Sequence, residues 1–320
     1  MFFIKCFFGF FLNFNSKIIK IILCLIFIIF LPNLVFTQTE IDILYTSNTN
    51  GALENCRCPN KALGSLEKRK YFIDEWYNNK PNTLFLDSGD FLSAKKNEFK
   101  DSIAFKIYEM LPYDAIGIGD QEFYNGINFI TNLIDNSTLP FISLNISLPK
   151  FKNVNDYIIL NKKNINFGII SIIDPDIFKF YPKRIRNNVE VFDFNVKLDD
   201  QIKFLKNKVD IIILLSHIGI EKDRDLAKKN NQIDIIIGGH SQSFLEKPEK
   251  INNTIVVHSG KDGYNVGHLK IKLNKKNKIH KFNGELIPMT LDMKSDSTVL
   301  EMIKNYHTLN QKKDIKLKND

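Results

Sequence analysis

Short apolar runs alternate with amphipathic segments along most of this chain, and this alternation strongly limits the folds open to it. The runs are rich in Ile and Val and apolar on both faces, which is typical of buried strands in a parallel sheet. They cover residues 83–87, 113–118, 139–144, 165–173, 209–215 and 233–238. Helical patterns lie between them at 64–77, 98–111, 199–208 and 222–231. The sequence therefore predicts an α/β domain with a parallel or mixed sheet core.

The pattern changes after residue 253, where strand-like runs follow one another with few helices. These runs lie at 254–260, 266–273 and 278–289, and a helical pattern at 297–309 comes after them. They predict an antiparallel portion of the sheet. A length of 320 residues suits one large domain. We expect that domain at 39–292, and a C-terminal helix with a basic tail at 293–320.

The first residues of the chain predict export. Lys17 and Lys20 precede an apolar run from Ile21 to Leu31, which has the length of a signal peptide and is short for a membrane span. We expect residues 1–38 to be a signal peptide cleaved near Thr37, or alternatively an uncleaved membrane anchor. The protein would then be periplasmic or extracellular, with membrane contact only through this segment.

The basic charge of the chain does not indicate nucleic-acid binding. The formal net charge is +8, of which three lysines belong to the N-terminal segment. Much of the remaining excess lies in lysine-rich stretches at 270–281 and 310–320, which we interpret as solvated surface. Neither stretch has aromatic interleaving or a recognition motif, so we expect no nucleic-acid partner.

Polar residues follow the apolar runs at the points where strands are expected to end. They are Asn48, Asn50, Asp90, Asp120, Gln121, His217, His240 and Gln242. Taken singly, Asp90 could cap a helix and His217 could be a packed core histidine. Ligands of α/β sheets gather at the carboxyl ends of the strands, however. Two carboxylates and two histidines at this edge together indicate a metal site.

In order and spacing, the segments ILYTSNTNGAL, GDF, GDQEF, LSHIG and GGHSQ resemble the calcineurin-like metallophosphoesterases, in particular their exported 5'-nucleotidase-like branch. The resemblance covers residues 41 to about 290. It implies a four-layer α/β/β/α sandwich with two mixed sheets, two metal ions and a small phosphorylated substrate. The second domain of the 5'-nucleotidases does not fit in the remaining residues, so nucleotide specificity is not implied.

The resemblance distributes the ligands unevenly between the two metal positions. One ion would keep Asp90, Asp120, His217 and His240, a competent set for zinc, manganese or iron. The other would keep the shared Asp90 and the weak neutral amides of Asn48, Asn50 and Gln242. We therefore expect one divalent ion, and two only if other groups complete the degenerate position.

The chemistry that the resemblance implies is hydrolysis of a phosphate ester by metal-bound hydroxide. Asp120 and Gln121 occupy the catalytic motif, but Gln121 stands where the family has a histidine that assists the leaving group. An amide cannot donate a proton as an imidazole does, and such help is worth about 10²–10⁴-fold. We expect slow or absent hydrolysis of ordinary monoesters. The alternative is a non-catalytic or thiol-redox protein on the same fold.

Cys56 and Cys58 follow the first motif closely, and three interpretations of them stay open. They could be thiolate ligands that rebuild the second metal position, a redox pair, or a structural pair. If the N-terminal segment is removed, Cys6 and Cys24 are lost with it. His258, in the run at 254–260, is a possible substrate-binding residue or a packed strand histidine.

Overall fold

The computed structural model describes residues 39–319 apart from 57, 60–61 and 148–150. The predicted export signal, with Cys6 and Cys24, lies outside the described residues. In the part that is described, no helix is both long and apolar enough to cross a membrane.

The described strands form two large mixed sheets, and the first has the order β15-β14-β1-β2-β3-β4-β6. Neighbours β1 to β4 and β6 pair in parallel, whereas β14 and β15 add to β1 in antiparallel fashion. The members are β1 (Glu40–Thr46), β2 (Leu84–Asp87), β3 (Ala115–Gly117), β4 (Phe141–Ile142), β6 (Val154–Asn155), β14 (Asn265–Leu273) and β15 (Ile279–Pro288).

The second sheet has the order β12-β13-β11-β10-β8-β7, with β8, β10, β11 and β13 parallel and the two outer strands antiparallel. Its members are β7 (Tyr157–Lys162), β8 (Ile165–Ile173), β10 (Ile211–His217), β11 (Ile235–Gly238), β12 (Glu249–Ile251) and β13 (Thr254–His258). A small antiparallel pair, β5 (Ile146–Ser147) and β9 (Glu190–Val191), lies apart from both large sheets.

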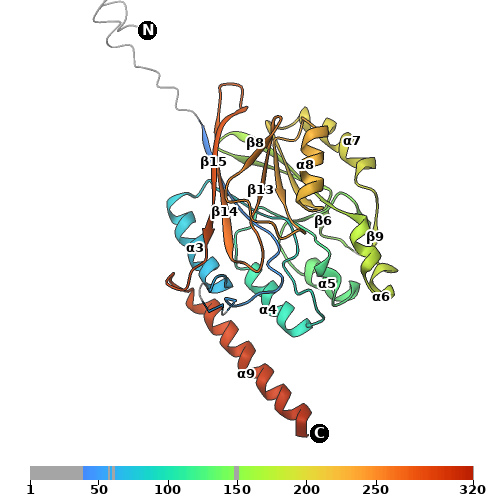
Figure 1. The fold of residues 1–320 in the computed structure, drawn as a ribbon, viewed down its shortest axis with the longest axis vertical. Coiled ribbons are helices and arrows are strands. Elements are labelled where there is room, and N and C mark those ends of the chain that lie inside the picture. The colour runs from blue at the N-terminus through green and yellow to red at the C-terminus, as the bar shows by residue number, and fades with distance from the viewer. Residues whose placement is uncertain (1–38, 57, 60–61, 148–150, 320) are drawn as a thin grey trace, which may run out of the picture. The chain divides into compact units, whose positions relative to one another are not determined.

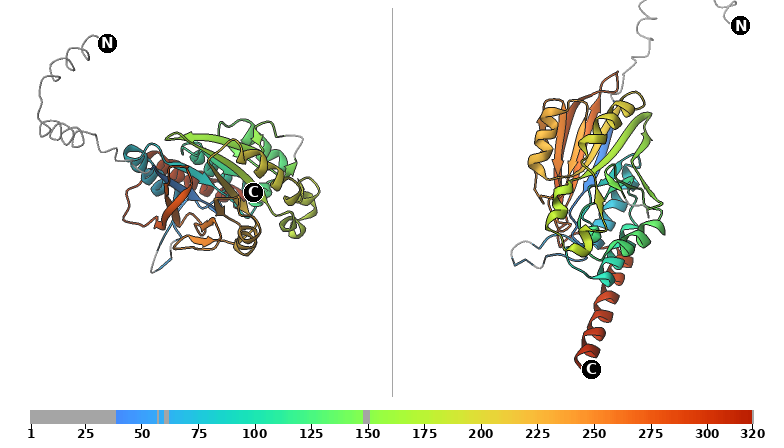
Figure 2. Two further views of the ribbon diagram at one scale, coloured as in Figure 1. Left: turned by 90° about the horizontal axis from the view of Figure 1, so that it is seen from above. Right: turned by 90° about the vertical axis from the view of Figure 1, so that its right-hand side faces the viewer.

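Helices cover the two outer faces of the paired sheets (Figure 1). The first sheet packs against α3 (Leu66–Asn79), α4 (Glu98–Tyr108), α5 (Ile127–Asp135) and α9 (Ser297–Asn319). The second packs against α7 (Asn195–Lys206) and α8 (Ile220–Lys229). The short elements η1 (Gln121–Phe123), η2 (Pro175–Phe180) and α6 (Lys183–Arg186) lie in the connections. Figure 2 shows that α9 extends beyond the sheets.

The apolar runs explain the layers, because alternate residues of one strand enter different cores. In β10, Ile211 and Ile213 face the core between the sheets, whereas Ile212 and Leu214 face α7 and α8. A strand buried on both sides has to be apolar on both faces. The predicted four-layer α/β/β/α sandwich with two mixed sheets is confirmed.

Candidate metal centre

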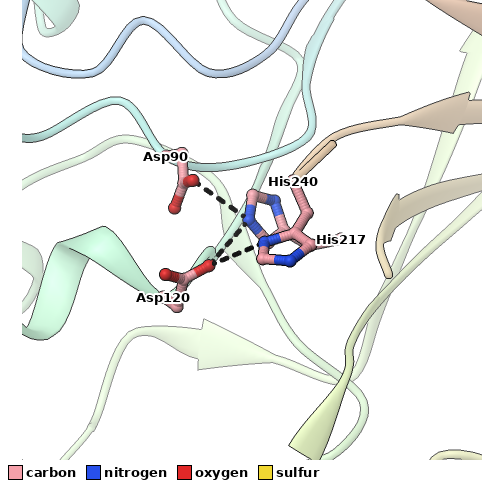
Figure 3. A group of neighbouring side chains, drawn as sticks. All are labelled: Asp90, Asp120, His217 and His240. Atoms are coloured by element: carbon pink, nitrogen blue, oxygen red, sulfur yellow. Dashed lines mark hydrogen bonds and ion pairs between the residues drawn. The ribbon is translucent and has the colours of Figure 1, made fainter. Parts of the chain in front are cut away.

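Four of the predicted residues meet where strands of the two sheets end (Figure 3). Asp90 follows β2, Asp120 follows β3, His217 ends β10 and His240 follows β11. Each offers one ligand atom, and these atoms all lie within 4.8 Å of one another. Because parallel strands present their carboxyl ends at one edge, residues far apart in sequence converge there.

The contacts within this Asp/His group centre on His217, whose side chain is 1% exposed. Its Nε2 lies 3.3 Å from Asp90 Oδ2 and 3.1 Å from Asp120 Oδ1. His240 Nδ1 lies 3.3 Å from the same oxygen of Asp120. Two carboxylates and two imidazoles this close together, three of them buried and His240 partly exposed, fit a divalent transition-metal ion. The residues present therefore suit the metal that the fold implies.

A backbone carbonyl fixes the orientation of the His217 ring. Its Nδ1 lies 2.7 Å from the carbonyl oxygen of Ser88, so Nδ1 carries a proton and donates it there. Nε2 is then the nitrogen turned toward Asp90 and Asp120. Such outer contacts are the usual means of fixing the tautomer of a metal-binding histidine.

The charges of the group shift the pKa values of its members in opposite directions. Burial by itself lowers the pKa of His217, but the carboxylates of Asp90 and Asp120 raise it well above its ordinary value. Burial raises the pKa of Asp120, yet hydrogen bonds from His217 and His240 outweigh this and hold it below its usual range. The site therefore favours positive charge among its carboxylates, and a metal ion would replace the proton on Nε2.

Glu122, which the sequence reasoning missed, holds the loop of Asp90. One carboxylate oxygen accepts from the backbone N–H groups of Asp90 at 3.0 Å and Gly119 at 2.7 Å. The other accepts from Phe91 at 2.8 Å and Leu92 at 3.1 Å. Burial and the charge of Asp90 raise the pKa of Glu122 to about 8. Its only signal in the sequence was its place two residues after Asp120.

Tyr181 is a second residue that the sequence reasoning missed. Its hydroxyl donates a hydrogen bond to Asp120 Oδ2 and leaves Oδ1 turned toward the two histidines. Burial and the charge of Asp120 raise the pKa of Tyr181 above its ordinary value, so the hydroxyl keeps its proton. Nothing in the sequence near 181 indicates this contact, because the residue lies on the separate connection that follows β8.

Close backbone approach explains a glycine at this centre. A Cβ at Gly119 would lie 2.4 Å from Asp90 Oδ1 and 2.8 Å from His217 Cε1. Both distances are well inside van der Waals contact, so any other residue would displace a ligand. Glycine therefore lets the β2 and β3 ends meet.

The amides predicted to form a weak second metal position are bonded to protein groups. Asn48 Oδ1 accepts from the backbone N–H of His240 at 2.9 Å, and its Nδ2 donates to the carbonyl of Gly260 at 2.9 Å. Asn50 Nδ2 donates to Asp262 Oδ1 at 2.7 Å. These side chains join loops from distant parts of the chain, which neutral amides do well.

Gln121 completes this amide network. Its Nε2 donates to Asp90 Oδ2 at 2.9 Å and to Asn50 Oδ1 at 3.0 Å. Both oxygens would be available to a cation if the amide were absent. As arranged, the residues at the second position do not fit an ion. The amide N–H₂ group of Gln121, which donates to Asp90 Oδ2 and Asn50 Oδ1, occupies the place that a second cation would need.

The backbone is unusual at many of these residues. Five non-glycine residues of the two metal positions have φ in the left-handed region, where side chains are strained. They are Asn48 (50°), Asn50 (54°), Asp90 (59°), His240 (67°) and Gln242 (53°). Such strain gathers at functional sites. Gln242 lies in the β11 loop, and its predicted role as a weak ligand stays a prediction.

Cys56 and Cys58 are joined by a disulfide, and Cys58 is exposed. Among the described residues, the group of possible metal ligands does not include them. The ligand, redox and structural interpretations of the pair all stay predictions.

His258 is fully buried, and its Nε2 lies 2.8 Å from Asp223 Oδ2. The same carboxylate accepts a hydrogen bond from the hydroxyl of Ser216. This arrangement ties β13 and β10 to α8 and leaves the ring no contact with solvent. Substrate binding by His258 stays a prediction that the observed burial does not support.

No family model matches the chain, but comparison with individual proteins gives relatives. A mouse 5'-nucleotidase is 25% identical over 307 residues, covering 81% of this chain and 51% of that protein. Among solved structures, a 5'-nucleotidase precursor from Thermus thermophilus superposes with a TM-score of 0.79 at 22% identity, covering 85% of this chain and 59% of the other.

A calcineurin-like phosphoesterase, YfkN from Bacillus subtilis, superposes with a TM-score of 0.69 at 23% identity, covering 85% of this chain and 97% of the other. The chain spans about half the length of the first curated relatives that it matches. The homologues and structural neighbours of this chain are thus 5'-nucleotidase-like, calcineurin-like phosphoesterases, and the chain has their metallophosphoesterase fold.

Proposed function

We propose that this chain is a divalent-metal-dependent hydrolase of phosphate esters. The observation that carries the proposal is the convergence of Asp90, Asp120, His217 and His240, whose ligand atoms lie within 4.8 Å of one another. The homology to phosphoesterases supports the same reaction class. Zinc, manganese and iron all suit two carboxylates and two imidazoles, and we propose one of these as the resident ion.

When bound, a divalent ion supplies positive charge that polarises the phosphate and lowers the pKa of a water. The protein groups do the positioning. The Glu122 carboxylate holds the backbone of Asp90, the Tyr181 hydroxyl holds Asp120, and the Ser88 carbonyl holds His217. These contacts keep the ligands in place before substrate arrives, which lowers the cost of reorganisation during the reaction.

Gln121 sets a limit on the substrates. Its amide hydrogens are bonded to Asp90 and Asn50, and an amide has no acidic proton to give to a departing alkoxide. The leaving group must therefore depart with a proton from water or as a stable anion. We propose that esters of acidic alcohols are hydrolysed faster than esters of alkanols.

The substrate class follows in part from the relatives, several of which are named 5'-nucleotidases. Nucleoside monophosphates are therefore among the first compounds to test. Export of the protein remains a proposal that rests on residues 1–38 of the sequence.

Hydrolysis of 4-nitrophenyl phosphate tests the function directly. Metal-free protein loaded in turn with zinc, manganese or iron(II) should turn over this ester with at least one of them. His217→Ala should lower kcat/KM at least about a hundredfold, since even partners of metal ligands are worth about 10–100-fold. His280→Ala, at an exposed position, is the matched control and should leave the rate unchanged. A rate that His217→Ala does not alter would contradict the proposal.

A second candidate function uses the disulfide of Cys56 and Cys58, because Cys58 is exposed and accessible to another thiol. In this function the pair exchanges electrons with a dithiol, and the Asp/His group is structural. Thiol titration before and after dithiothreitol, combined with the phosphatase assay, separates the two. A protein that cycles its thiols but hydrolyses no ester would favour the second candidate.

A further inference from the structure

A cavity of about 490 Å³ opens beside the Asp/His group and has no role in the arguments above. Asp120, Gln121 and His240 form one part of its lining. Tyr124, Phe180 and Tyr181 form another part. A molecule in this cavity would therefore contact both candidate metal ligands and aromatic side chains.

The aromatic part of the lining is held in a fixed position. The ring of Tyr181 lies 5.0 Å from that of Tyr124 and 5.3 Å from that of Phe178. Phe178 in turn lies 5.6 Å from Phe123, which is fully buried in the core. The hydroxyl of Tyr181 bonds to Asp120. The Tyr181 ring is thus held by its hydroxyl, which bonds to Asp120, and by its ring contacts with Tyr124 and Phe178.

Phe180 is the unusual member of this lining. Its side chain is 91% exposed, the largest fraction among the exposed large apolar side chains of the described residues. It ends η2, and Asp174 anchors the start of that segment by accepting from the backbone N–H of Asp176 at 3.0 Å and by pairing with Lys222 on α8. The Phe180 ring therefore has most of its apolar surface free to pack on a ligand, while the start of its segment is anchored.

We propose that this cavity binds the organic group of the phosphate ester, and that this group is a planar aromatic ring that packs against Phe180 and Tyr181. The inference rests on the proposed function, because the phosphate would lie at the Asp/His group. It also agrees with the limit set by Gln121. A phenolic leaving group has a pKa of about 10, far below that of an alkanol, and leaves without a proton donor more readily.

A binding measurement tests the cavity without any turnover. Phenylphosphonate and methylphosphonate carry the same anion on a stable carbon–phosphorus bond, so calorimetry on manganese-loaded protein reports only the organic group. We expect phenylphosphonate to bind more tightly than methylphosphonate. Phe180→Ala should weaken phenylphosphonate by about threefold to tenfold, the size of one aromatic contact, and leave methylphosphonate unchanged.

Phe204→Ala is the matched control, since Phe204 is an exposed phenylalanine on α7 that does not line the cavity. Phe180→Trp keeps an aromatic surface and should restore binding. Equal affinity for the two phosphonates, or phenylphosphonate binding that Phe180→Ala does not change, would overturn the inference.

Turnover of three esters separates this inference from the function and identifies the ring. Phenyl phosphate, adenosine 5'-monophosphate and glycerol phosphate present an aryl ring, a nucleobase and no ring. If Phe180→Ala lowers kcat/KM only for phenyl phosphate, the ligand is an aryl ester; if only for the nucleotide, it is a nucleoside ester. If all three esters are hydrolysed and Phe180→Ala changes none of the rates, the cavity proposal is wrong and the proposed function stands. If phenylphosphonate binds selectively but no ester is hydrolysed, the cavity proposal stands and the proposed function is wrong.

Discussion

At the scale of single residues, the centre depends on side chains that hold ligands as much as on the ligands themselves. Glu122 and Tyr181 are not among the four candidate ligands. Glu122 bonds to the backbone of Asp90, and Tyr181 bonds to the carboxylate of Asp120. Outer contacts of this kind fix the direction in which a carboxylate presents its oxygens. Their loss should therefore weaken metal binding while the four ligands stay present.

Tyr181→Phe tests this statement. The variant keeps the ring that packs on Tyr124 and Phe178 and removes only the hydroxyl that donates to Asp120. We expect the affinity for zinc to fall about tenfold, measured by competition with a chelator. Tyr124→Phe, on the neighbouring ring, should leave the affinity unchanged. Equal affinities of Tyr181→Phe and wild-type protein would show that Asp120 needs no such support.

For a physical reason, the sequence indicated the four candidate ligands but not the residues that hold them in place. Asp90, Asp120, His217 and His240 each follow an apolar run, and the carboxyl end of a buried strand can be located from hydrophobicity alone. Tyr181 is 61 residues from Asp120 and lies in a connection with no periodic pattern. The amides of Asn48 and Asn50 looked like weakened ligands because their hydrogen-bond partners come from loops that only the folded chain brings near.

At the scale of elements too, the sequence predicts only those parts of the fold that carry a hydrophobic pattern. The apolar strands β8, β10 and β11 matched their predicted runs within a few residues, whereas two-residue strands such as β5 and β9 are too short to show a pattern in the sequence. The position of α8 on the second sheet likewise depends on a buried network. His258 on β13 reaches across Gly238 on β11 to bond to Asp223 on α8.

Gly238→Ala tests that packing. A Cβ there would lie 1.9 Å from His258 Nε2 and 2.3 Å from Asp223 Oδ2, so the ring or the helix must move. We expect the free energy of unfolding to fall by about 2–3 kcal/mol in urea denaturation. Gly126→Ala is the comparison, since a Cβ there meets nothing within 4 Å and only its positive φ adds cost, about 1 kcal/mol. A smaller loss at Gly238 than at Gly126 would contradict the packing argument.

A second contact between elements should depend on pH. Asp42 on β1 accepts hydrogen bonds from His268 on β14 at 2.7 Å and from Lys80 at the end of α3 at 3.2 Å. Burial raises the pKa of Asp42, but these two partners lower it below its ordinary value. A carboxyl whose pKa is lowered by folding stabilises the fold above its unfolded pKa, and this contribution is lost as the pH falls through the folded value.

Asp42→Asn should therefore lower the free energy of unfolding by about 1 kcal/mol at pH 6, and the difference from wild type should shrink as the pH falls below about 4. Urea unfolding of the metal-free protein between pH 6 and pH 3 measures it, and the comparison cancels groups common to both proteins. Asp200→Asn removes an exposed carboxylate on α7 and should change stability little at any pH. A difference at position 42 that grows toward low pH would show that the sign is wrong.

At the scale of the whole molecule, the centre joins the two sheets. Asp90 and Asp120 follow strands of the first sheet, whereas His217 ends a strand of the second sheet and His240 follows another. An ion held by all four would therefore link both halves of the sandwich, and the unfolded chain would lose it. At a free metal concentration of about 100 times Kd, such binding stabilises a fold by about 2.7 kcal/mol.

The number of ions follows from the same arrangement. One position has four candidate ligands, whereas at the other the Gln121 amide already donates to the oxygens of Asp90 and Asn50 that a second ion would need. Elemental analysis of metal-saturated, dialysed protein should thus give one ion per chain, and thermal unfolding should shift upward on loading. A variant with Asn48→Asp, Asn50→His and Gln242→His restores the missing ligand types, Gln121→His removes the amide that donates to Asp90 and Asn50, and the combined variant should hold two ions. Two tightly bound ions in the wild-type protein would instead show that groups outside the Asp/His group, such as Cys56 and Cys58 in their reduced form, complete the second position.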